Sequence, residues 1–350
     1  MSEIIRIGLD TSKSVFQLHG VDAAERPVLK LKLSRSKMLA FFAQQPPCLV
    51  ALEACGASHH WARTLAGLGH TVRLIAPQHV KPYVPGSKTD AADAAGLCEA
   101  VSRPQMRFVP VKTAEQQAAL MLTGLREQWL KRRTQVSNSL RGYAAEFGLA
   151  APQGLARLAE LVARLAEDPR VPALARPLFA ALWAEYQEIE ARVQEADRQL
   201  KVWQRGNASC RRLSAVPGIG PVGAALLVLK TPAPQAFRSG RDFAAWLGLT
   251  PKDHATAGKP RLGGITRAGD EQLRSVLVAG AMAVLRQLKP ESAGLAGWLT
   301  RLVARKARRL VAVALANKLA RIAWRLLVSG ASYDPARAGP PMGGAEPARA

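Results

Sequence analysis

Four acidic residues in the first hundred positions are of the type, and at the spacing, that could bind a hard cation. Asp90 and Asp93 lie three residues apart, so on a helix they would share one face and repel each other unless a cation lay between them. Asp10 and Glu53 each end an apolar run earlier in the chain. Carboxylate oxygens grouped in this way suit magnesium, with manganese as a substitute, and the chemistry of phosphodiesters.

Each acid also has a purely structural explanation. An acid at the end of a strand often belongs to a turn, and Asp90, which follows Thr89, could simply begin a helix. The four acids occur together in a very basic chain, however, and this combination favours a metal site over four separate structural roles.

The elements that would position these acids follow a definite order. We expect strands at 4–10, 15–21 and 28–33, a helix from Ser36, a strand at 48–53, a helix at 61–68 and a strand at 71–75. An antiparallel meander followed by alternating helices and strands is the order of the RNase H-like (RuvC-like) nucleases, and we expect it to occupy residues 1–110. Asp10 and Glu53 would then lie at the carboxyl ends of strands, where α/β folds place their sites.

Charge is the strongest compositional signal. The chain has 350 residues, with 49 Lys and Arg against 26 Asp and Glu, for a net charge of +23. Such a chain favours a polyanionic partner, because basic side chains release the counterions of nucleic-acid phosphates. No apolar run approaches the length of a membrane span, no signal peptide precedes the first strand, and the four cysteines lack the spacing of a zinc site. We expect a cytoplasmic protein that does not contact the membrane.

Residues 111–205 predict two long helices. The first follows a capping box at 113–116 and carries an apolar stripe that includes Tyr143. Its polar side chains could grip a nucleic-acid backbone or simply form a solvated face, and the candidates are Arg126, Arg132, Asn138 and Arg141. The second helix repeats apolar residues over three heptads from Leu182 to Trp203, which predicts a coiled-coil arm, either an internal hairpin or a dimerisation seam.

Residues 206–330 predict a mainly helical domain. Residues 213–227 resemble a helix-hairpin-helix, in which Gly218 and Gly220 would let backbone amides approach a phosphate; a tight turn without a ligand is the alternative. A polar loop follows Pro251, and its basic residues are nucleic-acid candidates: Lys259, Arg261, Arg267 and Arg274. Pro260 stands where a P-loop needs Ser or Thr, so the loop is not an NTPase motif.

The last part of the chain predicts one strongly basic helix and a tail. Basic residues from Arg301 to Arg325 surround an apolar stripe that includes Leu310. Residues 331–350 are rich in Pro, Gly and Ala, and we expect them to be disordered.

Taken together, these motifs resemble the DEDD-type insertion-sequence transposases. The resemblance covers residues 4 to 330 in the family's order, and it rests on Gly8-Leu-Asp10 with Lys13, Glu53-Ala, 88–93, the hairpin at 213–227, 248–251 and 269–274. It implies a DNA recombinase guided by a structured RNA, called bridge RNA or seekRNA, that pairs with target and donor DNA. It also implies that a RuvC-like domain holds magnesium on Asp10, Glu53, Asp90 and Asp93.

The resemblance further implies a serine that attacks DNA to give a covalent phosphoserine intermediate, in an assembly of dimers or tetramers. Here the sequence departs from the family, because position 255, which corresponds to the serine, is Ala255. Alanine has no oxygen with which to attack phosphorus. Thr256 is adjacent, but its hydroxyl is secondary and offset by one residue. We therefore expect a chain that binds its nucleic acids and is impaired in catalysis.

Two other classes of protein fit the same residues. A metal-dependent, structure-selective DNA endonuclease would use the acids to activate water and would need no serine. A basic RNA- or DNA-binding architectural protein would use the acids only structurally. Protein-free cleavage products would favour the endonuclease, and the absence of nicking under any condition would favour the architectural protein.

Overall fold

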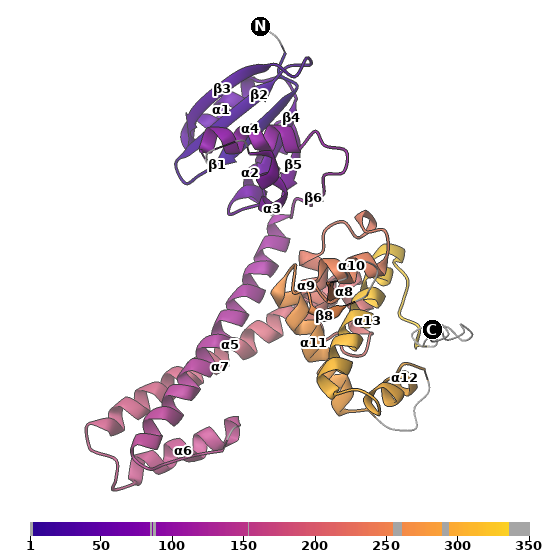
Figure 1. Cartoon of the computed structure of the whole chain (residues 1–350). Helices are drawn as coiled ribbons and strands as arrows, with labels where there is room; N and C mark the ends of the chain where they lie inside the picture. Colours follow the sequence, from indigo (N-terminus) through magenta and orange to yellow (C-terminus); the bar gives the residue numbers. More distant parts are fainter. Residues whose placement is uncertain are drawn as a thin grey trace. The chain divides into compact units, whose positions relative to one another are not determined.

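The computed structural model describes residues 3–84, 86, 89–152, 154–254, 261–288 and 294–335 (Figure 1). Its contacts divide the chain into two units. The first comprises Met1–Gln117 and Thr231–Arg238, and the second comprises Ala118–Lys230 and Ser239–Ala350. A short segment between two helices of the second unit therefore returns to the first, where the guanidinium of Arg107 lies 5.9 Å from the ring centre of Phe237.

The first unit is built on a mixed sheet with the strand order β3-β2-β1-β4-β5-β6. The strands are β1 (Arg6–Thr11), β2 (Val15–Val21), β3 (Pro27–Ser34), β4 (Leu49–Glu53), β5 (Thr71–Ile75) and β6 (Phe108–Val109). β1, β2 and β3 pair antiparallel, whereas β1, β4 and β5 pair parallel. The predicted meander, and the parallel strands that follow it, are confirmed as an RNase H-like order.

Helices cover both faces of this sheet. Helices α1 (Arg35–Gln44) and α2 (Ser58–Gly67) pack on one face, where Phe42 and Leu65 join Leu52 in an apolar core. Helix α4 (Asp90–Ala100) packs on the other face, where Leu97 joins Ala51 in a second core. Neighbouring residues of β4 thus point to opposite faces, as strand geometry requires. The turn before α4 contains α3 (Pro77–Val80) and η1 (Lys81–Tyr83).

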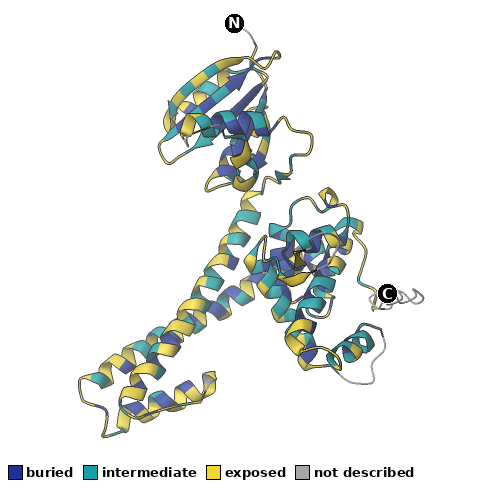
Figure 2. Cartoon of the chain, viewed as in Figure 1, coloured by how far each residue is buried: buried dark blue, intermediate teal, exposed yellow. Residues whose placement is uncertain are grey.

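Three helices form the start of the second unit. They are α5 (Ala114–Glu146), whose first residues belong to the first unit, α6 (Leu155–Glu167) and α7 (Ala175–Gly206). Leu140 of α5, Leu161 of α6 and Ile189 of α7 share one core, so the predicted heptad stripe of α7 packs inside the chain as an internal hairpin. Figure 2 shows mainly exposed and intermediate residues along these helices, with buried residues interspersed among them.

The capping box is confirmed, because the side chains and amides of Thr113 and Gln116 bond reciprocally at 3.0 and 3.1 Å. The prediction that Tyr143 belongs to the buried apolar stripe of α5 is wrong, since 59% of the Tyr143 surface is exposed. The core instead buries Leu140 and Ala144, four residues apart, so the buried stripe passes Tyr143 by.

Among the residues that the structure describes, the rest of the second unit consists of helices, their connections and one hairpin. Its elements are α8 (Ala208–Ser214), α9 (Pro221–Lys230), α10 (Gly240–Trp246), β7 (Pro251–Asp253), β8 (Leu262–Ile265), α11 (Glu271–Arg286), α12 (Gly294–Val303) and α13 (Arg308–Ser329), and the connection from α9 to α10 contains η2 (Pro234–Ala236) of the first unit. None of the helices that the structure describes is long and apolar enough to cross a membrane.

Two predictions concern the end of the chain, namely a single basic helix and a disordered tail. The single basic helix is wrong, because α12 ends at Val303 and α13 begins at Arg308. Leu310 is 62% exposed, since it lies in the first turn of α13 next to the buried face rather than on it. Residues 336–350 of the predicted tail lie outside the described residues.

Candidate active site

The register of the sheet places two of the four acids side by side. β1 and β4 pair in parallel with Leu9 opposite Leu52, so the next residues along each strand, Asp10 and Glu53, occupy adjacent positions at the same edge. Both project to the face that α4 covers, because Ala51, two residues before Glu53, packs in the core under that helix. This edge is the carboxyl end of the parallel strands, as the sequence predicted.

A glycine in β1 brings the other two acids to the same place. A side chain at Gly8 would put its Cβ atom 2.0 Å from the carbonyl oxygen of Ala94 and 2.6 Å from the amide nitrogen of Cys98, both in α4. Only glycine allows this contact, so α4 lies directly on β1, two residues from Asp10. The sequence carries a signal for this close approach, since a glycine inside a buried strand, such as Gly8, often marks a site where another backbone comes near.

The acid pair occupies the first turn of α4. The side chain of Thr89 caps this helix by accepting a 3.2 Å hydrogen bond from the amide of Ala92. Asp90 and Asp93 are therefore held at the positive end of the helix dipole, which favours their negative charge. Asp90 is exposed and Asp93 is half-buried, so the pair borders solvent where a strand of nucleic acid could approach.

Asp10 is affected electrostatically by the other three acids. The pKa of Asp10 is raised from 3.8 to about 6, first by burial and then by the negative charges of Asp90, Asp93 and Glu53. Each of these causes penalises the charged form of the carboxyl. The four acids therefore form one cluster of negative charge around a half-buried carboxylate, which we call the acid cluster.

The acid cluster fits a divalent metal in the type of its ligands and in its charge. Oxygen donors are what magnesium prefers, and a bound cation would relieve the repulsion that raises the pKa of Asp10. Within the described residues, no three acidic, histidine or cysteine side chains are already close enough together to hold a metal ion. The side chains would thus need to rotate towards an ion, while the backbone positions are set by β1, β4 and α4.

The polar loop predicted after Pro251 is flanked by the two antiparallel strands β7 and β8, which form a β-hairpin. Its base is closed by a 2.9 Å hydrogen bond from the amide of Thr266 to the carbonyl of Thr250, and by a 3.0 Å bond from the amide of His254 to the carbonyl of Arg261. The expected nucleophile position Ala255, its neighbour Thr256 and the candidate Lys259 lie outside the described residues. Arg261 is exposed at the edge of this hairpin.

Two of the candidate basic residues contact the base of the hairpin, Arg274 through its side chain and Arg267 through its backbone amide. Arg274 donates hydrogen bonds of 3.1 Å to the carbonyls of Leu247 and Ala268, which ties the end of α10 to the loop before α11. Arg267 adopts a left-handed backbone with φ of 57°, and its amide bonds to the carbonyl of Gly248. These contacts brace the hairpin base, and nucleic-acid contact by either residue stays a prediction.

The helix-hairpin-helix is present as α8, a turn and α9, but its two glycines differ. Gly218 has φ of 92° and packs against α11, where a side chain at Gly280 would come within 1.8 Å of the Gly218 carbonyl oxygen. Helix packing therefore accounts for Gly218 without a phosphate. Gly220 is exposed, and a side chain there would meet no atom within 4 Å, so packing does not account for this glycine and its contact with a phosphate stays a prediction.

The candidate arginines of α5 mostly pair with carboxylates of α7. Arg126 bonds Asp197 at 2.6 Å and Arg132 bonds Glu185 at 2.9 Å. These pairs join α5 and α7 as antiparallel neighbours, and they account for both arginines without nucleic acid. Of the two remaining candidates on α5, Arg141 donates hydrogen bonds to the side chain of Ser137 and to the carbonyl of Gly154, whereas Asn138 is exposed.

Comparison with known proteins identifies the family. The pattern described as "Transposase IS116/IS110/IS902 family" matches residues 210–295, and a DEDD transposase pattern of the IS110 type matches residues 7–147. The chain is 58% identical over 334 residues to a "Putative transposase y4pF/y4sB" of Sinorhizobium fredii, which covers 95% of this chain and 86% of that protein.

Two further relatives align along nearly their whole length. A "Probable family 20 transposase" of Pseudomonas aeruginosa is 49% identical, covering 94% of this chain and 98% of the relative. The "Transposase for insertion sequence element IS1328" of Yersinia enterocolitica is 37% identical, covering 95% and 100%. With a DEDD domain at its start and the second family domain near its end, the chain belongs to the IS110/IS116/IS902 family of transposases.

Proposed function

We propose that this transposase cuts and rejoins DNA under the direction of a guide RNA, with Mg²⁺ held by the acid cluster of Asp10, Glu53, Asp90 and Asp93. Target and donor DNA would be the substrates, and a dimer or tetramer would be the working assembly. The observation that carries the proposal is geometric: β1 and β4 place Asp10 beside Glu53, and the capped helix α4, which bears Asp90 and Asp93, rests on Gly8 two residues away. A cluster of like charge at a strand edge is costly unless it serves to bind a cation.

The chain's own residues would position the reacting strand. Asp10 and Glu53 are fixed by paired strands, while Asp90 and Asp93 are fixed by a capped helix that rests on Gly8. Rigid elements of this kind hold a site more accurately than loops do. When bound, magnesium supplies positive charge that stabilises the attacking and leaving oxygens of a phosphoryl transfer.

The covalent step would need a hydroxyl at position 255. A serine oxygen there would form a bond to phosphorus while the departing DNA oxygen takes the electrons of the broken P–O bond, so the ester conserves the bond for rejoining. Ala255 carries only a methyl group. We infer that the chain as it stands binds its nucleic acids without forming this ester.

Restoring the hydroxyl tests the proposal. Ala255→Ser is expected to yield a covalent protein–DNA adduct on a denaturing gel when guide RNA, labelled DNA and Mg²⁺ are present. The matched control is Ala255→Ser combined with Asp90→Asn, which should retain RNA binding and give no adduct. The proposal fails if Ala255→Ser binds both nucleic acids and forms no adduct, or if the double variant forms as much adduct as the single variant.

A hydrolytic reaction is the second candidate, and Ala255 itself is the observation that favours it. The acid cluster is present although the serine is absent, so water could serve as the attacking group. Incubation of the unaltered chain with branched DNA and Mg²⁺ distinguishes the two reactions. Cleaved ends that carry no protein, and that disappear in Asp10→Asn, would assign hydrolysis to the cluster.

A further inference from the structure

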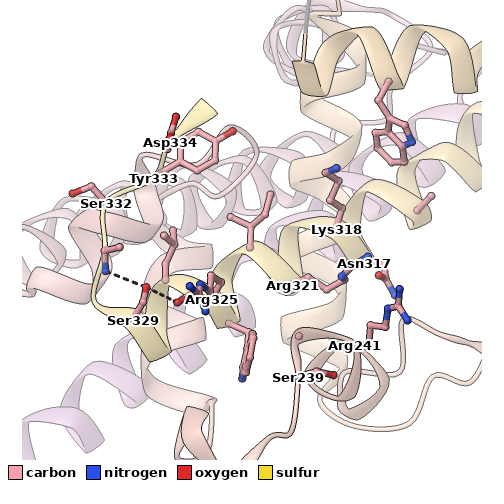
Figure 3. Close-up of a pocket in the computed structure, with 17 residues that line it drawn as sticks. Ser239, Arg241, Asn317, Lys318, Arg321, Arg325, Ser329, Ser332, Tyr333 and Asp334 are labelled. Atoms are coloured by element: carbon pink, nitrogen blue, oxygen red, sulfur yellow. Dashed lines mark hydrogen bonds between the residues drawn. The ribbon is translucent and has the colours of Figure 1, made fainter. Parts of the chain in front are cut away.

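A basic cavity of about 970 Å³ lies within the second unit, away from the acid cluster in sequence. Its walls come from the start of α10, from α12, from one face of α13 and from the segment after α13 (Figure 3). Four cationic side chains line it, namely Arg241, Lys318, Arg321 and Arg325, against a single carboxylate on Asp334. Four cations against one carboxylate leave three uncompensated positive charges, so the cavity suits an anionic ligand.

The cations of this cavity differ from those of α5. In the part of the chain that the structure describes, none of the four forms an ion pair with a carboxylate, whereas Arg126 and Arg132 of α5 do. Crowding of like charge is evident at Lys318, whose pKa is lowered by burial and by neighbouring Arg321. Positive charge that the chain does not neutralise internally is available to a partner.

Close packing of α10 on α13 builds one side of the cavity. A Cβ atom at Gly240 would lie 3.2 Å from both the Cα and the Cβ atoms of Arg321, so the start of α10 rests directly on α13. Lys318, Arg321 and Arg325 then follow one another at spacings of three and four residues on one helix face. The row spans about 10 Å along the helix, which is the length of about three stacked nucleotides.

Aromatic groups accompany the cations. The Nζ atom of Lys318 lies 5.0 Å from the ring centre of Trp298, and Trp298 is half-buried in the cavity wall. Tyr333 lines the cavity from the segment that follows α13, as Figure 3 shows. Cations that follow a backbone, together with rings on which bases can stack, are the combination that binds unpaired nucleic acid.

We propose that this cavity holds a single-stranded segment of nucleic acid, with phosphates on Lys318, Arg321 and Arg325 and a base against Trp298 or Tyr333. A duplex fits the observations less well, because its bases are stacked inside the helix and cannot reach aromatic side chains in a concave wall. The inference rests on the proposed function only in that a nucleic acid is the partner. It requires neither the acid cluster nor a metal ion.

The test is a binding assay with the full chain in EDTA, using short fluorescein-labelled oligo-U and oligo-dT. Charge reversal of two exposed residues, Arg321→Glu with Arg325→Glu, is expected to weaken binding by roughly tenfold or more and to reduce the slope of log affinity against log salt by about 1.4. The matched control is Arg301→Glu with Arg309→Glu, which changes the net charge equally on exposed residues that do not line the cavity.

Trp298→Ala separates stacking from charge, and we expect it to weaken binding roughly fivefold or more without a change in salt slope. Tighter binding of oligo-U than of oligo-dT would assign the cavity to RNA, and the reverse would assign it to DNA; either result supports the proposal. Equal effects of the two double variants would overturn it, as would tighter binding of a duplex of the same length. The assay contains EDTA and alters no residue of the acid cluster, so failure of the metal site and failure of the cavity are distinguishable.

Discussion

Replacing Asp10 with asparagine is expected to stabilise the metal-free chain around β1 and α4 at neutral pH. The pKa of Asp10 is raised from 3.8 to about 6, and each tenfold change in the proton affinity of a group corresponds to about 1.36 kcal/mol. The ionised carboxylate would thus cost the fold about 3 kcal/mol if solvent did not screen it. Asp10 is only half-buried, so we expect a gain of about 1 to 1.5 kcal/mol for Asp10→Asn.

The local stability that Asp10→Asn gains over the unaltered chain should increase as the pH rises. A raised carboxyl pKa means that the folded state binds the proton more tightly than the unfolded chain, so the favourable contribution is complete below 3.8 and is lost as pH rises through about 6. Asp10→Asn lacks this titration. Its advantage over the unaltered chain should therefore be full at pH 7.5 and vanish near pH 4.

Hydrogen exchange of the amides in β1 and α4, measured by mass spectrometry in EDTA, reports this local free energy. A local measurement is needed because the chain has two compact units, and a global unfolding transition would not report on β1 and α4 alone. Glu146→Gln is the control, since Glu146 is exposed on α5, and we expect it to change protection by less than about 0.5 kcal/mol. Unchanged or weaker protection in Asp10→Asn at pH 7.5 would refute the charge penalty that burial and the neighbouring acids impose on Asp10.

Three further predictions test the elements that support the site. Gly8→Ala is expected to lower the free energy of unfolding by more than about 3 kcal/mol and to expose α4 to proteolysis, because the added Cβ would clash with α4. The control Gly124→Ala, whose Cβ would meet no atom within 4 Å, should raise the free energy of unfolding by up to about 1 kcal/mol. Equal stability of the two variants would disprove the close approach of α4 to β1. Burial raises the pKa of the Cys210 thiol to about 12, so iodoacetamide at pH 8 should label exposed Cys55 and spare Cys210, as peptide mapping would show. Arg274→Ala leaves two carbonyls without their donor, so it should increase hydrogen exchange in β7 and β8; unchanged exchange would remove its bracing role.

The fold of the first unit was predictable because its signals are local. Apolar runs end at Asp10 and Glu53, and parallel register alone places those two acids together. Convergence with Asp90 and Asp93 depends on how closely α4 approaches β1. That approach is a packing property of Gly8, whose meaning becomes clear only when the helix is in place.

The roles of the basic residues were harder to predict. A row of arginines on a helix has the same appearance whether it faces solvent, nucleic acid or another helix. The carboxylate that pairs with Arg126 is Asp197, which lies 71 residues away in the sequence. Only the antiparallel register of α5 and α7 brings the two together. Conversely, the sequence of α13 alone could not show that its cations line a cavity, because α10 and α12 form the other walls of that cavity.

The most direct test of the acid cluster is a crystal structure of the full chain with Mn²⁺, recorded at a wavelength that reveals the metal by anomalous scattering. We expect manganese between β1, β4 and α4, bound by oxygens of Asp10 and Glu53 together with Asp90 or Asp93. Saturating Mn²⁺ that leaves no anomalous peak among these four side chains would contradict it.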